Sequence, residues 1–177
     1  MSAIISDCGL YRYRLERDLG ALTGGKTIAF IMVNPSTADA ETDDPTIRKV
    51  KGFAQRMGAS RVIVGNLFAF RATDVKALNT AADPVGPYGG SYLRNIMREA
   101  DIVVVAWGAS AKLPPRLRSR WMQVVELAET YGIPLMCLGT AKDGHPLHPC
   151  MIGYERPVVE WRRPGALSPL QATEAAR

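Results

Sequence analysis

Four runs of continuously apolar residues, rich in β-branched side chains, constrain the fold of this chain more than any other feature of its sequence. Strands that are buried on both faces have such continuous runs, which are typical of parallel sheets. Segments with helical spacing separate the runs, so the order of elements predicts right-handed βαβ units in an α/β fold. The four expected strands cover residues 27–33, 61–65, 102–107 and 134–138.

The segments between these runs have the spacing and the end signals of amphipathic helices. The first helix is expected to start with Asp44 as its N-cap and Pro45 in the first helical position. Apolar residues then recur every three to four positions, and Gly58 ends the helix. Two further helices and one short helix are expected over 92–99, 116–131 and 74–78.

The segment 10–17 differs in pattern from the four apolar runs. Residues 10–17 alternate imperfectly between apolar and charged side chains, which indicates a half-exposed strand that could join the sheet antiparallel at an edge.

With 177 residues, of which 47% are hydrophobic, the chain can bury one core of ordinary size. We expect one α/β domain over residues 1–163, followed by a tail over 164–177 that has no strong pattern.

Charge and cysteine content narrow the expected partners and compartment. The net charge of +5 favours an anionic partner such as a nucleotide or nucleic acid, although many basic proteins bind neither. Three widely spaced cysteines do not form a disulfide framework, so a reducing, cytoplasmic compartment is expected. The first seven residues lack a signal-peptide pattern, and the longest apolar run, 102–107, is too short to cross a bilayer. We therefore expect no membrane partner.

Polar residues follow the expected carboxyl ends of the buried strands. In open α/β sheets, ligands bind just outside this edge, so these residues are the candidates for a site. They are Asn34 and Ser36 after the first run, Asn66 and Arg71 after the second, Trp107 at the end of the third, and His145 and His148 after the fourth. A single pocket is expected to contain Asn34, Asp43, Asn66, Arg71 and at least one of the two histidines.

Several of these side chains have both a chemical role and a plainer alternative. An asparagine amide offers donors and an acceptor, so Asn34 could hold a water or read a base edge, or it could cap the turn before Pro35. Asp43 and Thr46 lie at the start of the first helix, where Asp44 is the expected cap. Asp43 is therefore the freer carboxylate for orienting a water. Two nearby acids compete with it, Asp39 and Glu41.

Basic side chains give a weaker signal. Arg71 could bind a phosphate through its fork of donors, or it could be a solvated loop arginine. A run of charges is usually the solvated face of a helix, although it can also form a basic surface for an anionic partner. The other basic residues considered for such a surface are Arg48, Lys49, Arg116, Arg118 and Arg120.

His145 and His148 are the only histidines of the chain, and each precedes a proline in one short polar loop. Such residues are not expected in the core, and either could act as an acid or donate to developing charge. With Cys150 and the nearby Cys137 they raise the alternative of a metal site, but their spacing matches no standard zinc motif, so no metal is expected. No P-loop and no glycine-rich dinucleotide fingerprint is present, so no cofactor is expected either.

Five of the motifs taken together resemble a bacterial family that is labelled only as domain of unknown function 1643. The resemblance covers roughly residues 10–152, and the label implies no activity. The motifs are Asn34-Pro35-Ser36-Thr37-Ala38-Asp39, Asp43-Asp44-Pro45-Thr46-Ile47-Arg48, Asn66-Leu67-Phe68-Ala69 with Arg71-Ala72-Thr73, Ala106-Trp107-Gly108-Ala109, and Gly144-His145-Pro146 with His148-Pro149.

A more distant resemblance is to the uracil-DNA glycosylase superfamily. Asn34-Pro35-Ser36 is similar to the water-positioning Asn-Pro-Gly motif of some subfamilies, and Asn66 could match their base-reading asparagine at a later strand end. His148-Pro149-Cys150 is similar to their His-Pro-Ser loop near the flipped nucleotide. Ser36 stands where those subfamilies have glycine, and Cys150 where they have serine. The resemblance implies a three-layer α/β/α fold with a mostly parallel central sheet.

This second resemblance implies a hydrolase that cleaves an N-glycosidic bond in a nucleotide or nucleic acid. Asn34, helped by Asp43, would position a water, Asn66 would bind the base edge, and His148 or His145 would stabilise charge on the departing base. Ser36, Thr46, Arg71 and Trp107 complete the expected substrate-binding set. A non-catalytic nucleotide-binding or nucleic-acid-binding domain, and a transferase that modifies a nucleoside or tRNA base, are the alternatives, because fold alone does not decide function.

Overall fold

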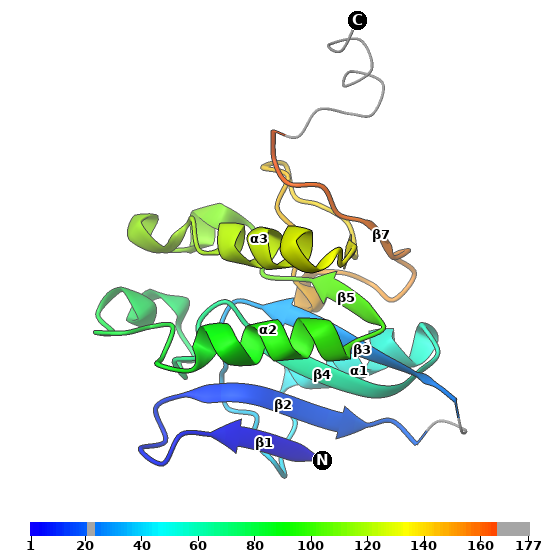
Figure 1. Cartoon of the computed structure of the whole chain (residues 1–177), viewed down its shortest axis with the longest axis horizontal. Helices are drawn as coiled ribbons and strands as arrows, with labels where there is room; N and C mark the ends of the chain where they lie inside the picture. Colours follow the sequence, from blue (N-terminus) through cyan, green and yellow to red (C-terminus); the bar gives the residue numbers. More distant parts are fainter. Residues whose placement is uncertain (21–23, 166–177) are drawn as a thin grey trace, which may run out of the picture.

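The computed structural model describes residues 1–20 and 24–165 and has a seven-stranded sheet at its centre (Figure 1). The strands lie side by side in the order β1-β2-β4-β3-β5-β6-β7. Their bounds are β1 Ser2–Ile5, β2 Arg12–Asp18, β3 Lys26–Met32, β4 Ala59–Asn66, β5 Ile102–Val105, β6 Leu135–Cys137 and β7 Val159–Glu160.

The four apolar runs form neighbouring parallel strands, as predicted. These strands, β4-β3-β5-β6, make up the centre of the sheet. The outer pairings, β1 with β2, β2 with β4 and β6 with β7, are antiparallel. The sheet is therefore mixed, with three parallel and three antiparallel pairings, rather than mostly parallel. The outermost strands β1 and β7 are not anticipated from the sequence, because they have only 4 and 2 residues.

The strand predicted over 10–17 is β2, and it is antiparallel to its neighbours. It does not form an edge, because β1 pairs along its outer side. Its side chains are accordingly buried rather than half-exposed. The buried residues of β2 are Arg12, Tyr13, Arg14, Leu15 and Arg17.

Within the described residues, three α-helices cover both faces of the sheet: α1 Pro45–Arg56, α2 Gly89–Glu99 and α3 Trp121–Tyr131. Figure 1 shows α2 and α3 in front of the sheet and α1 behind it. Asp44 caps α1 as predicted, because its carboxylate accepts the N–H of Ile47 at 2.8 Å. α3 begins later than predicted, because Pro115 starts a separate 3-10 turn. The 3-10 turns are η1 Val75–Asn79, η2 Ser110–Lys112, η3 Pro115–Leu117 and η4 Pro149–Met151.

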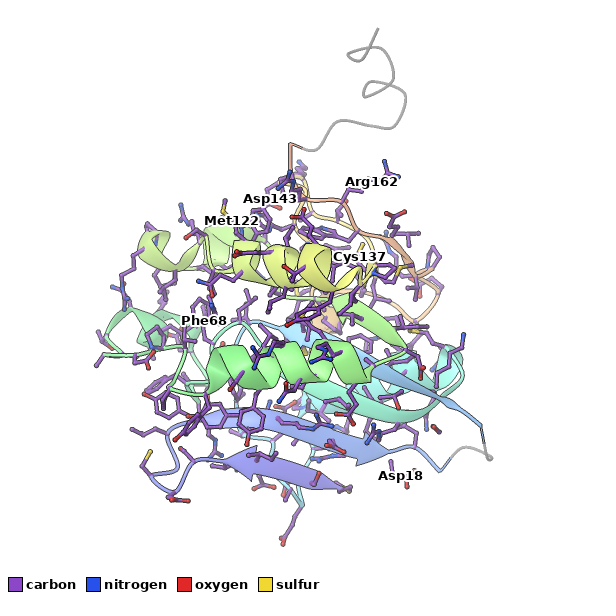
Figure 2. All side chains as sticks on the ribbon, viewed as in Figure 1. Asp18, Phe68, Met122, Cys137, Asp143 and Arg162 are labelled. Carbon is purple, nitrogen blue, oxygen red and sulfur yellow. The ribbon has the colours of Figure 1, made fainter. Side chains whose placement is uncertain are left out.

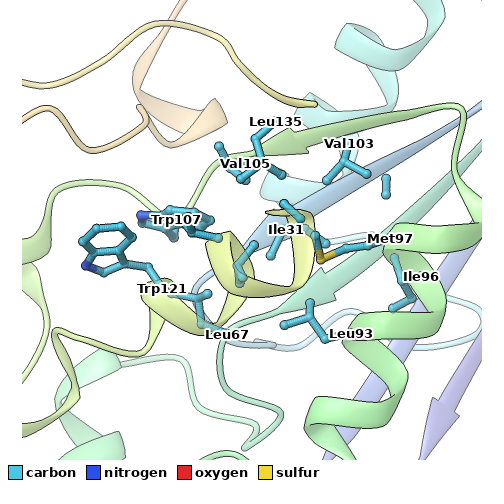
Figure 3. Packing of buried hydrophobic residues seen from close by; sticks show 14 of the residues in the cluster. Ile31, Leu67, Leu93, Ile96, Met97, Val103, Val105, Trp107, Trp121 and Leu135 are labelled. Carbon is cyan, nitrogen blue, oxygen red and sulfur yellow. The ribbon is translucent and has the colours of Figure 1, made fainter. Parts of the chain in front are cut away.

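Side chains fill the space between the helices and the sheet (Figure 2), and the buried hydrophobic ones form two clusters. In the first, Leu93, Ile96 and Met97 of α2 pack against the sheet beside Val103 and Val105 of β5 (Figure 3). The second cluster joins α1 to the opposite face and includes Phe30, Val50, Phe53 and Val64. Alternate residues of a central strand therefore face different helices, which determines the side of the sheet that each strand-end side chain reaches.

Three further expectations concern the termini, membranes and cysteines. Most of the expected tail falls on residues 166–177, which lie outside the described residues. Across residues 1–20 and 24–165, no helix combines the length and the apolar character that crossing a bilayer requires. Cys8, Cys137 and Cys150 are all free thiols.

Candidate functional site

A cavity of about 290 Å³ lies at the carboxyl ends of β3, β4 and β5, next to the N-terminus of α1. This is the sheet edge at which the sequence predicts a site. Six of the predicted site residues line the cavity: Asn34, Ser36, Thr46, Asn66, Trp107 and His148. The other three, Asp43, Arg71 and His145, do not line it. Four polar residues that were not predicted also line it: Arg12, Asp44, Thr73 and Lys112.

Asn66 is the last residue of β4, and its amide lies in the cavity wall without a partner. The side chain is 7% exposed, and neither Oδ1 nor Nδ2 has a hydrogen bond among the described residues. Val64 and Val62, two and four residues earlier, pack toward α1, so alternation brings Asn66 to the same face. An unsatisfied buried amide costs about 1–3 kcal/mol. Asn66 therefore offers a ligand one acceptor and two donors that are already desolvated.

Asn34 follows β3 by two residues, and the backbone holds its amide in place. Its Nδ2 donates to the carbonyl of Ala72 at 2.7 Å and to that of Pro35 at 3.0 Å. Both amide hydrogens are therefore used, and only Oδ1 is left as an acceptor. These bonds tie the loop after β3 to the loop after β4. The turn-capping alternative and the water-holding role are compatible, because the two roles use different atoms of the same amide.

Arg12, the first residue of β2, reaches the cavity from beyond β4. Its side chain is only 2% exposed, and Nη1 donates to the carbonyl of Ala38 at 2.7 Å. The Nε atom is buried and has no hydrogen-bond partner within the described part of the chain. Burial is the largest influence on this guanidinium and lowers its pKa to about 10, while the carboxylate of Asp44 acts in the opposite direction. Arg12 therefore supports the loop after Ser36 and adds a positive charge to the cavity.

An irregularity in the pairing of β1 with β2 explains why Arg12 was not predicted. Ile4 pairs with Arg14 and Ile5 pairs with Arg12, so Tyr13 is an extra residue on β2. Tyr13 stacks on Tyr92 of α2, and Arg14 also reaches the α2 side, where it pairs with Glu99. The extra residue turns Arg12 to the opposite face, which is a known effect of a β-bulge. Imperfect alternation over 10–17 is the only trace of this bulge in the sequence.

Asp44 and His148 bring an acidic and a neutral titratable group to the cavity. One oxygen of Asp44 caps α1, and the other has no hydrogen bond among the described residues. Nδ1 of His148 accepts the N–H of Cys150 at 3.4 Å, so the neutral ring carries its proton on Nε2. Burial and the charge of Lys112 lower the pKa of His148, and Asp44 opposes them. His148 is therefore a neutral donor at neutral pH.

Asp43, predicted as the water-orienting carboxylate, does not lie in the cavity. Its oxygens pair with Nε of Arg17 at 2.6 Å and with Nζ of Lys51 at 2.8 Å. Burial raises the pKa of Asp43, but the hydrogen bonds from Lys51 and Arg17 outweigh this effect, and the pKa lies below its usual value. The sequence does not show which of two adjacent acidic residues, Asp43 or Asp44, faces the cavity. Asp44 caps the helix as predicted, and it also lines the cavity.

Arg71, predicted as a phosphate ligand, does not line the cavity. Its Nη1 donates to the carbonyl of Gly9 at 3.3 Å, and its own N–H donates to the carbonyl of Leu10 at 2.9 Å. These contacts join the loop after β4 to the turn between β1 and β2. Arg71 therefore braces the turn that leads into Arg12, rather than lining the cavity itself.

His145, which was not expected in the core, is 6% exposed and lies among tryptophans. Its Nδ1 accepts the indole N–H of Trp107 at 3.2 Å, and its ring lies edge-on to Trp121 at 5.2 Å between centroids. Trp161 contacts both tryptophans. The prediction failed because polar loop neighbours say nothing about the aromatic side chains that other elements bring against a histidine. Of the two histidines, only His148 lines the cavity.

The basic residues outside the cavity are largely engaged within the protein. Arg116, Arg118 and Arg120 donate to backbone carbonyls of neighbouring loops. Arg48 donates to the carbonyl of Asp43, and Lys49 lies over the ring of Tyr154. Contacts within the protein account for the positions of these five basic side chains, so the side chains do not support an extended basic surface.

The histidine and cysteine side chains do not gather around a common point. Within the described part of the chain, no group of three or more His, Cys, Asp and Glu side chains could hold a metal ion. Cys150 instead lies 3.2 Å from the hydroxyl of Thr46, at the rim of the cavity. The cavity is therefore a site built from amide, guanidinium, carboxylate and imidazole groups.

One family model matches the chain, over residues 12–150, and its description is "Protein of unknown function (DUF1643)". No curated protein and no solved structure matches it. The matched span begins at Arg12 and continues past His148, so it contains every residue that lines the cavity. The strands β1 and β7 lie outside it.

Proposed function

This chain belongs to the DUF1643 family, and we propose that its cavity binds a nucleobase-containing ligand and hydrolyses an N-glycosidic bond. The single observation that carries this proposal is the amide of Asn66, which is nearly fully buried in the cavity wall with both polar atoms unpartnered. A buried donor and acceptor held side by side complement a cyclic –CO–NH– edge, which uracil, thymine and guanine present.

The size and walls of the cavity agree with a ligand of this kind. About 290 Å³ is just below the range of about 300–1,000 Å³ for small-molecule sites. Trp107 and Leu113 contribute apolar wall, against which a planar base can pack. A base within a duplex would first have to leave the stack to enter such a cavity.

Three polar groups supply the hydrolytic chemistry in this proposal. Oδ1 of Asn34 accepts a hydrogen bond from a water, and the free oxygen of Asp44 receives a proton from that water as it attacks the sugar carbon. The bond from the sugar carbon to the base nitrogen breaks, and the electron pair leaves with the base. Nε2 of His148 donates a hydrogen bond to the departing base without losing its proton. The base then takes up the proton that Asp44 received.

Two further features support a glycosylase-like enzyme. Asn34-Pro35-Ser36 and His148-Pro149-Cys150 resemble the motifs of the uracil-DNA glycosylase superfamily, and both motifs contribute lining residues of the cavity. Helices on both faces of the sheet are also consistent with the three-layer arrangement of that superfamily. In this proposal Asp44, and not Asp43, is the carboxylate that accepts the proton of the water, because Arg17 and Lys51 hold Asp43 away from the cavity.

The test is an incubation of the purified protein with nucleosides, nucleotides and single- and double-stranded oligonucleotides. Released base is detected by mass spectrometry, and affinity is measured by calorimetry. Asn34→Ala should depress turnover while leaving ligand affinity nearly intact, because a water-positioning group acts in the transition state. Asn66→Ala should weaken affinity by about 1–3 kcal/mol, the typical value of a bidentate base contact. The exposed Asn95, on α2, gives the matched control Asn95→Ala.

The same experiment separates the alternatives. A non-catalytic binding domain would bind but release no base, and both cavity variants would weaken its affinity. A transferase would form product only when a second substrate is present. The absence of both binding and base release with all of these compounds would reject the proposed function.

A further inference from the structure

β2 has three buried arginines, and only two of them have a carboxylate partner. Arg14 pairs with Glu99 at 2.7 Å, and Arg17 pairs with Asp43 at 2.6 Å. Arg12 is as deeply buried as Arg17, at 2% against 1%, yet it forms no ion pair with any described carboxylate. A buried charge is costly unless it is paired, so Arg12 is the exception that the fold leaves uncompensated.

The guanidinium of Arg12 has one edge in use and one edge free. Nη1 donates to the carbonyl of Ala38, which fixes the orientation of the group. Nε is buried without a partner, and no hydrogen bond joins Nη2 to any described residue. The Nε–Nη2 edge is the one that binds an oxyanion through two parallel hydrogen bonds. Arg12 lines the cavity, so this unpartnered edge belongs to a residue of the cavity wall.

The surroundings of Arg12 have an excess of positive charge. Lys112 is a second cation on the cavity wall, and among the described residues Asp44 is the only carboxylate there. Asp44 raises the pKa of Arg12 but lies outside ion-pairing distance, and burial still lowers that pKa to about 10. The N-terminus of α1, at Thr46, adds the positive end of a helix dipole. The cavity therefore favours a ligand with a negative charge.

We propose that Arg12 binds an anionic oxygen group of the ligand, a phosphate or a carboxylate, through the Nε–Nη2 edge of its guanidinium. The assignment of a base to the same ligand rests on the proposed function above. The assignment of the anionic group is independent of that function, because it follows from the burial of Arg12 and its unpartnered edge. Together they make the ligand class a nucleotide, or a nucleoside whose base carries a carboxylate, rather than a neutral nucleoside.

Calorimetry with the wild-type protein tests this proposal. The probes are inorganic phosphate alone, the four common ribonucleosides with their 5′-monophosphates, and uracil with uracil-6-carboxylate. We expect at least one anionic member of a pair to bind about tenfold or more tightly than its neutral partner, as charge-assisted hydrogen bonds of ordinary strength would produce. The pair that shows the difference identifies phosphate or carboxylate as the group bound.

Variants of β2 then assign the effect to one residue. Arg12→Gln should abolish the preference for the anionic compound, and Arg12→Lys should retain part of it. Arg14→Gln is the matched control, because Arg14 is buried on the same strand but faces α2. Thermal unfolding checks that each variant folds. The wild-type comparison needs no variant, so the proposal stays falsifiable if Arg12→Gln does not fold.

The outcomes separate this inference from the proposed function. Binding of neutral nucleosides with no gain from a phosphate or carboxylate would overturn the inference and leave the proposed function standing. Binding of inorganic phosphate that depends on Arg12, without binding of any base, would support the inference and reject the proposed function. The absence of a preference for any anionic probe overturns the inference in every case.

Discussion

The indole nitrogen of Trp107 donates a hydrogen bond to Nδ1 of His145 across 3.2 Å, and both side chains are buried. Because Nδ1 accepts, the neutral imidazole carries its proton on Nε2. Burial lowers the pKa of His145, against the opposing charge of Asp143, which keeps this neutral form at neutral pH. His145 therefore joins a cluster of tryptophans beside the cavity, and His148 is the histidine left for chemistry.

Replacing His145 should destabilise the protein more than replacing His148. His145→Leu leaves the buried indole N–H of Trp107 without an acceptor, which costs about 1–3 kcal/mol. His148→Leu removes only a long bond to the N–H of Cys150, so its cost in unfolding free energy should be smaller, while ligand affinity or turnover falls. Urea denaturation compares the two variants. Equal loss of stability would contradict this assignment of roles.

The two strand-end asparagines should respond to alanine in opposite ways. Asn34→Ala removes hydrogen bonds to the carbonyls of Ala72 and Pro35, so we expect a loss of about 1–2 kcal/mol in unfolding free energy. Asn66→Ala removes an amide that has no partner among residues 1–20 and 24–165, so unfolding free energy should stay unchanged or rise. Chemical denaturation without ligand measures both. A large loss for Asn66→Ala would show that its amide has a structural partner.

Asp43 should prove to be a structural residue. Asp43→Asn breaks its pairing with Arg17 and Lys51, and leaves Arg17 buried with backbone carbonyl partners only. Breaking a buried ion pair costs about 3 kcal/mol or more. We therefore expect a clear fall in unfolding temperature, with ligand affinity unchanged below that temperature. Asp39→Asn, in the same loop, is a control without an ion pair to lose. Loss of affinity in folded Asp43→Asn would restore its role in the site.

Stability should decrease as the pH falls through the titration range of the histidines. The pKa values of His145 and His148 are lowered by burial, whereas an unfolded histidine has a pKa of about 6.5. In the range between these values the unfolded chain binds more protons than the folded chain, so unfolding free energy falls from about pH 7 towards pH 5. Urea denaturation across this range measures the slope. His145→Gln and His148→Gln should each reduce it, and a flat profile would contradict the pKa direction.

Purified protein should contain well below one zinc ion per chain. Nδ1 of His145 accepts from Trp107, and Nδ1 of His148 accepts from the backbone of Cys150, so neither imidazole is oriented towards a shared metal with Cys150. Elemental analysis of protein purified without chelators measures the content. One zinc per chain that disappears in His148→Ala would overturn this prediction.

Much of the site's location can be predicted from the sequence, because short stretches of neighbouring residues determine the strands and the helix cap around it. Continuous apolar runs predict buried parallel strands, and parallel strands place their carboxyl ends at one edge, so the positions of Asn34, Asn66 and His148 in the chain are enough to expect them together. The cap at Asp44 is equally local, because Pro45 and the apolar spacing after it mark the helix start. Short strands such as β1 escape this kind of reading, because four residues carry too little pattern.

The sequence by itself determined the central strands, the start of α1 and the edge at which polar side chains meet, because hydrophobic periodicity and capping act between near neighbours in the chain. The tertiary structure alone decided which charges enter the cavity. A bulge against β1 turns Arg12 inward, ion pairs with Arg17 and Lys51 hold Asp43 outside, and Trp107 and Trp121 contact the buried ring of His145. Each of these outcomes depends on contacts between residues far apart in the chain, and no local pattern records which partner a charged or aromatic side chain will meet.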